Sequence, residues 1–521
     1  MSKPLVLTCD IGTQSARALL VDPDGRIVDV VQSKYAEPYF SKEPGWAEQK
    51  PNFYFDRLCE CCRELCARSN ALLPDVIAMT ITVIRDTVVC LDANNEPLRD
   101  IILWLDKRTV DPNGAMPAKN MMLFKVAGME PTAKVVYAAS VGNWIMRHEP
   151  EIWARTAKYV MLPTYLNYKL TGNLIDSASN QIGHIPFDYK NRRWMKPGSL
   201  TRCFCDVPNE KLCDLVPSGT VIGTITDEVC ALTGIPAGLP LISTGSDKGC
   251  ETLGSGCVDS TGASLSLGTT ATVQMTTDKY IETEPFVPTY PAVLPGKYNP
   301  EIEIYRGYWM ISWFKNEFAH KEVKEAQEIG ISAEELLNRH LKDVPAGCEG
   351  LILQPYWTPG IKHPTARGAI LGFADCHTRI HIYRAIIEGI AYGLYDGLLS
   401  IQRKTKIDVK FIAVSGGGSE SDEICQITSN IMGIPVRRAQ TYETSSLGAA
   451  ITAFTGLGVY NSFEEAAKNM VHIAAEFKPD MKEHALYEKL YSRIYRRIYP
   501  NNKRLYDDLK HILREAKAEE N

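Results

Sequence analysis

The stretch that decides the fold is residues 5–31, LVLTCDIGTQSARALLVDPDGRIVDVV, where an apolar run carries Asp10 into a glycine and hydroxyl turn and then resumes. Two apolar runs joined by such a turn, and closed by DPDG, predict a β-hairpin. The turn would offer unpaired backbone amides and the hydroxyls of Thr13 and Ser15 to phosphate oxygens, with Arg17 close by for charge. The stretch therefore predicts a phosphate-binding hairpin.

Asp10 is the unexpected residue of this hairpin, because a carboxylate repels bound phosphates unless a cation lies between them. We therefore expect magnesium, held by Asp10 directly or through water. The alternative is that Asp10 only accepts hydrogen bonds from amides of the turn.

The composition is that of an ordinary soluble protein: 521 residues, 45% apolar and 23% charged, give room for two or more domains. A net charge of −5 provides no general basic field for nucleic acid. Residues 1–25 lack the pattern of a signal peptide, and no apolar run reaches membrane-spanning length. We expect a cytoplasmic protein that binds a small molecule, with no nucleic acid and no membrane partner, and we leave a homodimer open.

The 15 cysteines are an odd number scattered along the chain, which favours free thiols in a reducing compartment. Cys59, Cys62 and Cys66 share one face of an expected helix with Leu58 and Leu65. Zinc ligation is the alternative, but no histidine or second CxxC pair lies near. We expect this face to pack in the core, without structural zinc.

Strand-like and helical patterns are mixed along the chain, which predicts α/β domains. Residues 263–277, ASLSLGTTATVQMTT, repeat the opening pattern around Gly268, Thr269 and Thr270, but no acid stands where Asp10 would fall. Taken as a repeat rather than as chance similarity, this predicts two similar domains, over residues 1–255 and 256–521. Two hairpins of this kind could hold the phosphates of one nucleotide with a single metal anchor.

A third glycine turn follows an apolar strand at FIAVSGGGSESDEICQITSNIMGIPV, residues 411–436. Gly416, Gly417 and Gly418 lead into a helix, an arrangement that brings backbone amides and a helix N-terminus close to a ligand. The alternative is a tight turn between a strand and a helix without a ligand.

Asp247 follows an apolar strand in LISTGSDKGCETLGSG, at the start of an expected helix. It could be only an N-cap. A short distance before the second hairpin, however, an aspartate could take the proton from a hydroxyl that attacks a γ-phosphate. This reading predicts a kinase.

Seven motifs, in order along essentially the whole chain, resemble those of the FGGY carbohydrate kinases, a family that includes glycerol kinase and xylulokinase. They are DIGTQSARALLVD, GWAEQ, ILWLDKRT, GSDKGCETLGSG, SLGTTATV, RAIIEGIAYGL, and VSGGGSESDEICQITSNIMGIPV together with ETSSLGAAITAFTGLGVY. The resemblance implies an α/β protein of two actin-like ATPase (ribonuclease H-like) domains with an interdomain cleft. The N-terminal domain would hold the sugar and the catalytic base, and the C-terminal domain the nucleotide.

The resemblance also implies roles for individual residues. Asp247 would be the general base and Asp10 the magnesium anchor, with ATP as the second cofactor. The implied ATP-binding residues are Thr13, Gln14, Ser15, Arg17, Gly268, Thr269, Gly416, Gly417 and Ser421. An active site divided between two domains is expected to close on its ligands.

The expected acceptor site contains Arg85, Asp86, Trp104 and Asp247, with Arg108 in the same module. Arg85 and Asp86 align with the segment in which glycerol kinase uses an arginine and a glutamate, and such a pair can clamp vicinal hydroxyls. A surface ion pair is the alternative. Xylulokinases have Met-His there, yet HEPEIWARTAKYVMLPTYLNYKLTG resembles the xylulokinase framework more closely.

Two departures from the family pattern lie close to the expected sugar site. Lys248 stands where relatives carry Gln or Asn, and we expect its ammonium to lower the pKa of Asp247 or to contact phosphate. The usual lysine-containing segment reads ASVGNW instead.

The expected activity is transfer of the γ-phosphate of ATP to a terminal hydroxyl of a ketopentose (xylulose or ribulose type) or a small polyol. The alternatives are a glycerol- or erythritol-type polyol kinase and, from another class, an actin-like or chaperone-like ATPase switch.

Overall fold

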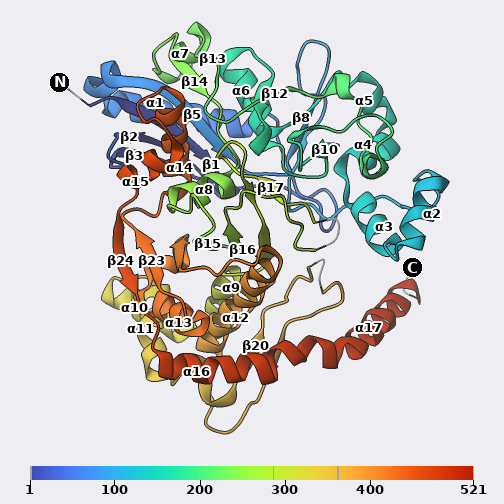
Figure 1. Ribbon diagram of the computed structural model, residues 1–521, viewed down its shortest axis with the longest axis vertical. Helices are drawn as coiled ribbons and strands as arrows, with labels where there is room; N and C mark the ends of the chain where they lie inside the picture. The colour runs from blue at the N-terminus through green and yellow to red at the C-terminus, as the bar shows by residue number, and fades with distance from the viewer. Residues whose placement is uncertain (1–2, 285–286, 361–362, 520–521) are drawn as a thin grey trace. The chain divides into compact units, whose positions relative to one another are not determined.

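The computed structural model describes residues 3–284, 287–360 and 363–519 and divides into two compact units (Figure 1). The first unit consists of Met1–Gly254, Asp278–Asn299 and Glu443–Val471, and the second of Ser255–Thr277, Pro300–Tyr442 and His472–Asn521. These units differ from two consecutive halves, because two later segments of the chain pack in the first unit.

The first unit is built on a six-stranded sheet in the order β13-β14-β5-β1-β2-β3. Its strands are β1 (Leu5–Ile11), β2 (Ser15–Val21), β3 (Ile27–Lys34), β5 (Val76–Val83), β13 (Val221–Thr224) and β14 (Pro240–Ile242). The opening hairpin forms as predicted, with β1 antiparallel to β2 and Asp10 opposite Arg17. Strand β5 runs parallel to both β1 and β14.

The second unit repeats this pattern in a sheet of order β19-β16-β15-β22-β23-β24. Its strands are β15 (Gly262–Leu267), β16 (Ala271–Met275), β19 (Glu301–Ile304), β22 (Phe411–Ser415), β23 (Val436–Ala439) and β24 (Ile473–Phe477). Here β15 and β16 form the antiparallel hairpin, and β22 runs parallel to both β15 and β23. The predicted α/β repeat is therefore confirmed by the sheet topology.

The two sheets differ at one edge. In the first unit the antiparallel edge strand β13 precedes its neighbour β14 in the chain, whereas in the second unit β24 follows β23. The shared part is the hairpin and the two parallel strands beside it, which are the elements that carry the predicted phosphate turns.

Several helices complete the first unit. They are α1 (Phe53–Arg68), α2 (Ala118–Val126), α3 (Glu130–Ala139), α4 (Val141–His148), α5 (Pro150–Arg155), α6 (Leu162–Thr171), α7 (Asp227–Thr233), α8 (Asp247–Gly254), α14 (Thr444–Gly456) and α15 (Phe463–Met470). A smaller sheet, β4-β7-β6-β8, contains β4 (Glu48–Gln49), β6 (Val88–Leu91), β7 (Ile101–Ile102) and β8 (Lys158–Met161). The two-stranded pairs are β9 (Ile175–Ser177) with β12 (Asp214–Val216), β10 (Phe187–Asp188) with β11 (Arg193–Trp194), and β17 (Tyr290–Pro291) with β18 (Tyr298–Asn299).

Helix α1 covers the face of the first sheet opposite Asp10. The Sγ atoms of Cys9 on β1 and Cys62 on α1 are 3.4 Å apart. Because successive side chains of a strand point to opposite faces, Asp10 points away from α1. Cys59, Cys62 and Cys66 are all buried in this core, which confirms the core-packing interpretation of the cysteine face.

Helices α8 and α14 pack against one another, and α14 also packs on β1 and β5. Their contact depends on glycine at two positions. A Cβ atom at Gly254 would lie 1.9 Å from the carbonyl oxygen of Thr444, and one at Gly448 would lie 1.9 Å from that of Cys250. Helix α14 thus lies on the sheet, and α8 packs closely against α14.

The helices of the second unit are α9 (Trp309–Phe318), α10 (His320–Ile329), α11 (Ala333–Arg339), α12 (Arg379–Thr405), α13 (Asp422–Met432), α16 (Met481–Leu490) and α17 (Arg496–Glu519), with a small pair β20 (Ile352–Gln354) and β21 (Ala369–Leu371). Helix α12 is buried along most of its length and packs on β16, β19 and β20. Its Arg384 Nε donates to Glu388 Oε1 at 2.8 Å, which pairs both charges one helical turn apart.

Of the helices in the described ranges, none is both long and apolar enough to span a bilayer.

Candidate active site

The turn of the first hairpin is closed by a hydrogen bond from the Gly12 amide to the Ser15 carbonyl oxygen, at 3.0 Å. Gln14 is exposed at its tip, and Ser15 is buried where β2 begins. The Thr13 hydroxyl accepts a hydrogen bond from the indole nitrogen of Trp104 at 2.9 Å. The structure thus links Thr13, which is predicted to contact phosphate, to Trp104, which is predicted to contact the acceptor.

Asp10 lies in a cluster of charges. Arg17 Nη1 is 3.5 Å from Asp10 Oδ2, and Arg17 Nε is 3.1 Å from Oε1 of Glu443, the residue that precedes α14. Burial raises the pKa of Asp10 to about 7, although Arg17 opposes the rise. Three further carboxylates add to it: Glu443, Asp247 and Glu251. The first unit therefore concentrates negative charge around one buried carboxylate.

This donor set fits a magnesium ion. Carboxylate oxygens are the ligands that Mg²⁺ prefers, and a divalent cation would relieve the repulsion from Glu443, Asp247 and Glu251 that adds to the effect of burial on Asp10. Within the described ranges, no group of three or more His, Cys, Asp or Glu side chains could by itself hold a metal ion. A magnesium here would need water and phosphate oxygens to complete its coordination.

Asp247 is the first residue of α8, and its Oδ1 accepts a hydrogen bond from the amide of Lys248 at 2.7 Å. Burial raises the pKa of Asp247 above its ordinary value, while Arg85 and Lys248 oppose the rise. Lys248 does lower this pKa, as expected, but burial is the larger effect. Its ammonium lies 2.8 Å from Glu251 Oε2, one turn along the helix.

Asp86 is paired with a residue that the sequence did not indicate. Its Oδ1 accepts from the amide of His184 at 2.9 Å, and its Oδ2 lies 2.8 Å from His184 Nδ1. Burial would raise the pKa of Asp86, but the charge and hydrogen bonds of His184 hold it below its usual value. Arg85 places its guanidinium 5.2 Å from the ring centre of Tyr290. Asp86, predicted to bind vicinal hydroxyls together with Arg85, is therefore also paired with His184.

Arg108, grouped with the acceptor module from its motif, is buried in an ion network. It lies 3.0 Å from Glu48 Oε1, and its guanidinium is 3.9 Å from the ring centre of Trp46. Arg99 also donates to Glu48, at 2.8 Å, and Lys42 lies 2.8 Å from its other oxygen. The GWAEQ and LDKR motifs are thus joined by the ion pair of Glu48 with Arg108.

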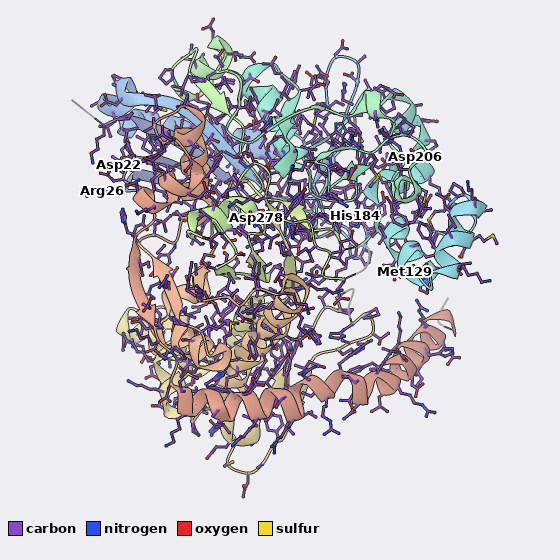
Figure 2. The ribbon with its side chains drawn as sticks, in the orientation of Figure 1. Asp22, Arg26, Met129, His184, Asp206 and Asp278 are labelled. Atoms are coloured by element: carbon purple, nitrogen blue, oxygen red, sulfur yellow. The ribbon has the colours of Figure 1, made fainter. Side chains whose placement is uncertain are left out.

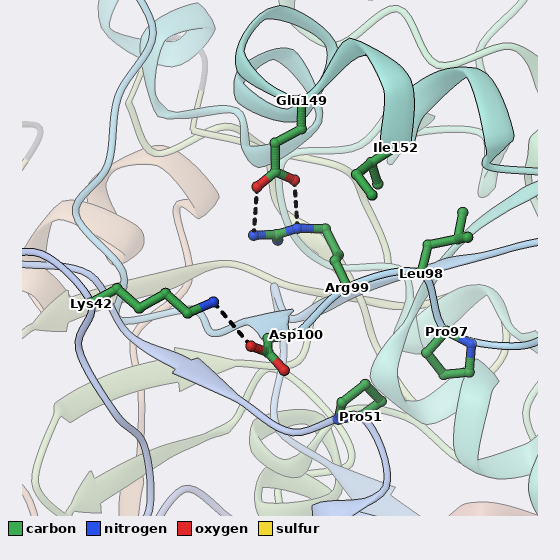
Figure 3. Close-up of a pocket in the computed structure, with 8 residues that line it drawn as sticks. All are labelled: Lys42, Pro51, Pro97, Leu98, Arg99, Asp100, Glu149 and Ile152. Atoms are coloured by element: carbon green, nitrogen blue, oxygen red, sulfur yellow. Dashed lines mark hydrogen bonds and ion pairs between the residues drawn. The ribbon is translucent and has the colours of Figure 1, made fainter.

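A cavity of about 410 Å³ lies beside this network (Figure 3). Its lining includes Lys42, Arg99, Asp100, Glu149 and several apolar side chains. The charged groups are paired across it, with Arg99 Nε 2.7 Å from Glu149 Oε2 and Lys42 Nζ 3.0 Å from Asp100 Oδ2. Neither Asp10 nor Asp247 lines this cavity, so it is separate from the candidate site.

In the second unit, the turns predicted to hold ATP lie next to one another. A Cβ atom at Gly416, whose φ is +78°, would lie 3.0 Å from the carbonyl carbon of Leu267 and 3.1 Å from the amide of Gly268. Thr269 and Gly417 are exposed. The Ser421 hydroxyl caps α13 by accepting from the amide of Ile424 at 3.3 Å.

The predicted site residues are divided between the two units. Asp10, Thr13, Gln14, Ser15, Arg17, Arg85, Asp86, Trp104 and Asp247 belong to the first unit, and Gly268, Thr269, Gly416, Gly417 and Ser421 to the second. Three charged neighbours were missed: Glu443, Glu251 and His184. Glu251 stands four residues after Asp247 on one helix, and this spacing could have indicated it.

Two family models match this chain. Residues 5–254 match the N-terminal domain of the FGGY family of carbohydrate kinases, and residues 263–457 match its C-terminal domain. The chain belongs to the FGGY family of carbohydrate kinases. It is therefore an ATP-dependent phosphotransferase, and the family predicted from the seven motifs is confirmed.

Individual FGGY proteins resemble the chain over nearly its whole length. An uncharacterized sugar kinase of Escherichia coli is 28% identical over 92% of this chain and 90% of its own. A xylulose kinase of Staphylococcus epidermidis is 28% identical over 94% of this chain and 95% of its own. The solved structure of a ligand-bound xylulose kinase from Lactobacillus acidophilus superposes with a TM-score of 0.81, at 23% identity over 97% of this chain and all of that one. The last likeness confirms the two-domain FGGY fold.

Proposed function

We propose that this FGGY kinase transfers the γ-phosphate of ATP to a terminal hydroxyl of a ketopentose of the xylulose or ribulose type, or of a small polyol, with Asp247 as the general base. The observation that carries the proposal is the setting of Asp247. One of its oxygens is held by the Lys248 amide, and Arg85 is close enough to lower its pKa. A carboxylate with a pKa raised by burial is better matched to accepting a proton from a hydroxyl.

The nucleotide would be bound by residues of both units. The amides and hydroxyls of residues 12–15 and 268–270 suit phosphate oxygens, and Gly416, Gly417 and Ser421 suit the adenosine. Asp10 would hold magnesium, with Glu443, Asp247 and Glu251 adding negative potential around it. When bound, magnesium would neutralise charge that develops on the transferring phosphoryl group. Arg17 would balance the charge of Asp10 and Glu443.

The acceptor class rests on two arguments. Similarity to xylulose kinases favours a ketopentose, and the Arg85 and Asp86 segment provides both donors and acceptors for neighbouring oxygens. A glycerol- or erythritol-type polyol kinase is the second candidate, because Arg85 and Asp86 align with the arginine and glutamate of glycerol kinase. The ATPase-switch alternative is not kept, because the family acts on carbohydrates.

Location and assembly stay predictions from the sequence. A cytoplasmic location was inferred from the cysteine pattern, and a homodimer was left open.

Replacing Asp247 by Asn tests the proposed base. We expect the transfer rate to fall by about a hundredfold or more, with ATP affinity nearly unchanged. Asp227→Asn is a matched control, because Asp227 also begins a short helix of the first unit but is exposed. ADP release and calorimetric ATP binding are the measurements. Undiminished transfer by Asp247→Asn would disprove the role.

An acceptor panel tests the substrate class. Xylulose, ribulose, glycerol, erythritol, xylitol and ribitol are compared in a coupled assay of ADP release, and the phosphorylated product is identified by mass. We expect the highest kcat/KM with a ketopentose. Turnover on none of them would contradict the proposed function.

A further inference from the structure

The pair formed by Asp86 and His184 joins two loops of the first unit. Asp86 has a positive φ of 47°, and its amide donates to the Ile182 carbonyl oxygen at 3.0 Å. Gly183 lies against it, since a Cβ atom there would be 2.2 Å from Asp86 Oδ1. His184 (Figure 2) then binds both oxygens of Asp86, through its amide and its Nδ1. A strained backbone held by this many contacts is typical of functional sites.

The pairing leaves one nitrogen of His184 available. Nδ1 is used by Asp86, whereas Nε2 has no hydrogen-bond partner among the residues that the structure describes. The side chain of His184 is 35% exposed and that of Asp86 is 26% exposed. An imidazolium donates through both nitrogens, and each oxygen of Asp86 keeps further acceptor capacity. The pair can therefore contact a ligand through both residues.

The charged surroundings favour the protonated ring. Burial alone would lower the pKa of His184, but the charge and hydrogen bond of Asp86 raise it above the ordinary value. The other groups in this neighbourhood are Arg85, whose charge acts on Asp86, and Tyr189, whose hydroxyl donates to the Gly183 carbonyl oxygen at 2.9 Å. Arg85 also acts on Asp247, so the pair and the proposed base share one charged neighbour.

We propose that His184 is an acceptor-binding residue that selects a ketose over the polyol of the same length, by donating a hydrogen bond from Nε2 to the carbonyl oxygen. This rests on the proposed function. A carbonyl oxygen only accepts hydrogen bonds, and the imidazolium of His184 and the guanidinium of Arg85 only donate them. A polyol presents a hydroxyl at that position, whose own proton needs an acceptor. Asp86 acts by holding the ring of His184 in place.

The test compares His184→Gln with the whole wild-type chain. Glutamine is uncharged, so we expect a KM for the ketose about tenfold or more above wild type at pH 6, with a smaller change for the matching polyol. The wild-type KM for the ketose should rise as pH increases through the pKa of His184, without a parallel change in kcat. In His184→Gln that rise should be absent. Xylulose with xylitol, and ribulose with ribitol, are the probes.

His340→Gln is the matched control, because His340 Nδ1 lies 2.7 Å from Asp343 Oδ2 in a similar pair in the second unit. The His340→Gln variant should keep the wild-type dependence of the ketose KM on pH. Calorimetric binding of the same probes to Asp247→Asn protein, with and without His184→Gln, measures the ketose preference without turnover. If His184→Gln keeps the wild-type KM for the ketose, the wild-type pH dependence of that KM and the wild-type ketose preference, the inference about His184 is overturned while the proposed function stands. Absence of both binding and phosphorylation for all probes would overturn it together with the proposed function.

Discussion

Lys248 and Glu251 shift the pKa of the proposed base, Asp247, in opposite directions. The Lys248 ammonium lowers the pKa of Asp247, and Glu251 raises it. Lys248→Gln should therefore raise this pKa further and move the loss of activity at low pH to a higher pH. Glu251→Gln should move it to a lower pH. The measurement is the pH profile of kcat/KM for both variants, and a shift in the same direction would contradict this electrostatic account.

The Asp86 and His184 pair predicts a pH-dependent contribution to stability. The pKa of His184 is raised above 6.5, so its contribution is complete below pH 6.5 and is lost as pH rises through the raised pKa. The pKa of Asp86 is lowered below 3.8, so its contribution is complete above pH 3.8 and is lost as pH falls through the lowered pKa. The full contribution lies between pH 3.8 and pH 6.5.

Asp86→Asn should lower the free energy of unfolding by about 1–3 kcal/mol at pH 5.5, because a charged hydrogen bond is lost. The difference from wild type should shrink at a pH above the raised pKa of His184, where the ring is neutral in both proteins. Denaturant unfolding at the two pH values measures this. The Asp343→Asn variant, in an exposed pair, serves as control. An equal loss at both pH values would be evidence against a charged His184.

Residues that act within one turn could be predicted from the sequence, and residues brought together by the fold could not. Asp10, Thr13 and Arg17 belong to one hairpin, whose strand register sets Asp10 opposite Arg17. His184 reaches Asp86 across 98 residues, and Glu443 reaches Arg17 from a segment near the end of the chain. No local pattern encodes such pairs, because they depend on how separate loops pack. For the same reason the motif of Arg108 was visible in the sequence, but its burial beside Glu48 was not.

At the scale of elements, the contact of α8 with α14 depends on Gly448, which has no side chain to separate the two helices. Gly448→Ala would place a methyl group 1.9 Å from the Cys250 carbonyl oxygen, and backbone must move to accommodate it. We expect the free energy of unfolding to fall by about 1–3 kcal/mol. Since the proposed base Asp247 is the first residue of α8, the transfer rate should fall as well. Ser445→Ala on the same helix is the control, and wild-type stability of Gly448→Ala would refute the close contact.

The network around Glu48 makes a second prediction at this scale. Glu48 is fully buried and pairs with Arg99, Arg108 and Lys42. Glu48→Gln leaves buried guanidinium charge poorly compensated, at a cost of about 3–5 kcal/mol. Glu149→Gln, whose side chain is 28% exposed and pairs with Arg99, should cost at most about 1 kcal/mol. Thermal and denaturant unfolding compare the two, and equal losses would contradict the central place of Glu48.

At the scale of the whole molecule, the predicted nucleotide residues are shared between the units. Asp10, Thr13 and Arg17 belong to the first unit, and Thr269 and Ser421 to the second. If both groups bind one ATP, the units must move together when it binds together with the acceptor. Small-angle scattering should give a smaller radius of gyration with acceptor and a nonhydrolysable ATP analogue than without ligands. ADP alone is the comparison, and an unchanged radius would argue against an open resting state.

The interleaving of the two units has a consequence for how the protein is made. The chain passes between the units five times, and α14, which packs on β1 and β5, lies within the final returning segment, Glu443–Val471. A ribosome therefore completes β1 and β5 long before it synthesises the helix that covers them. Domains usually fold as units during synthesis, the N-terminal one first. Here β1 and β5 keep an uncovered apolar surface until residue 456 has been synthesised, so we expect the first unit to complete its folding only after most of the chain has been made.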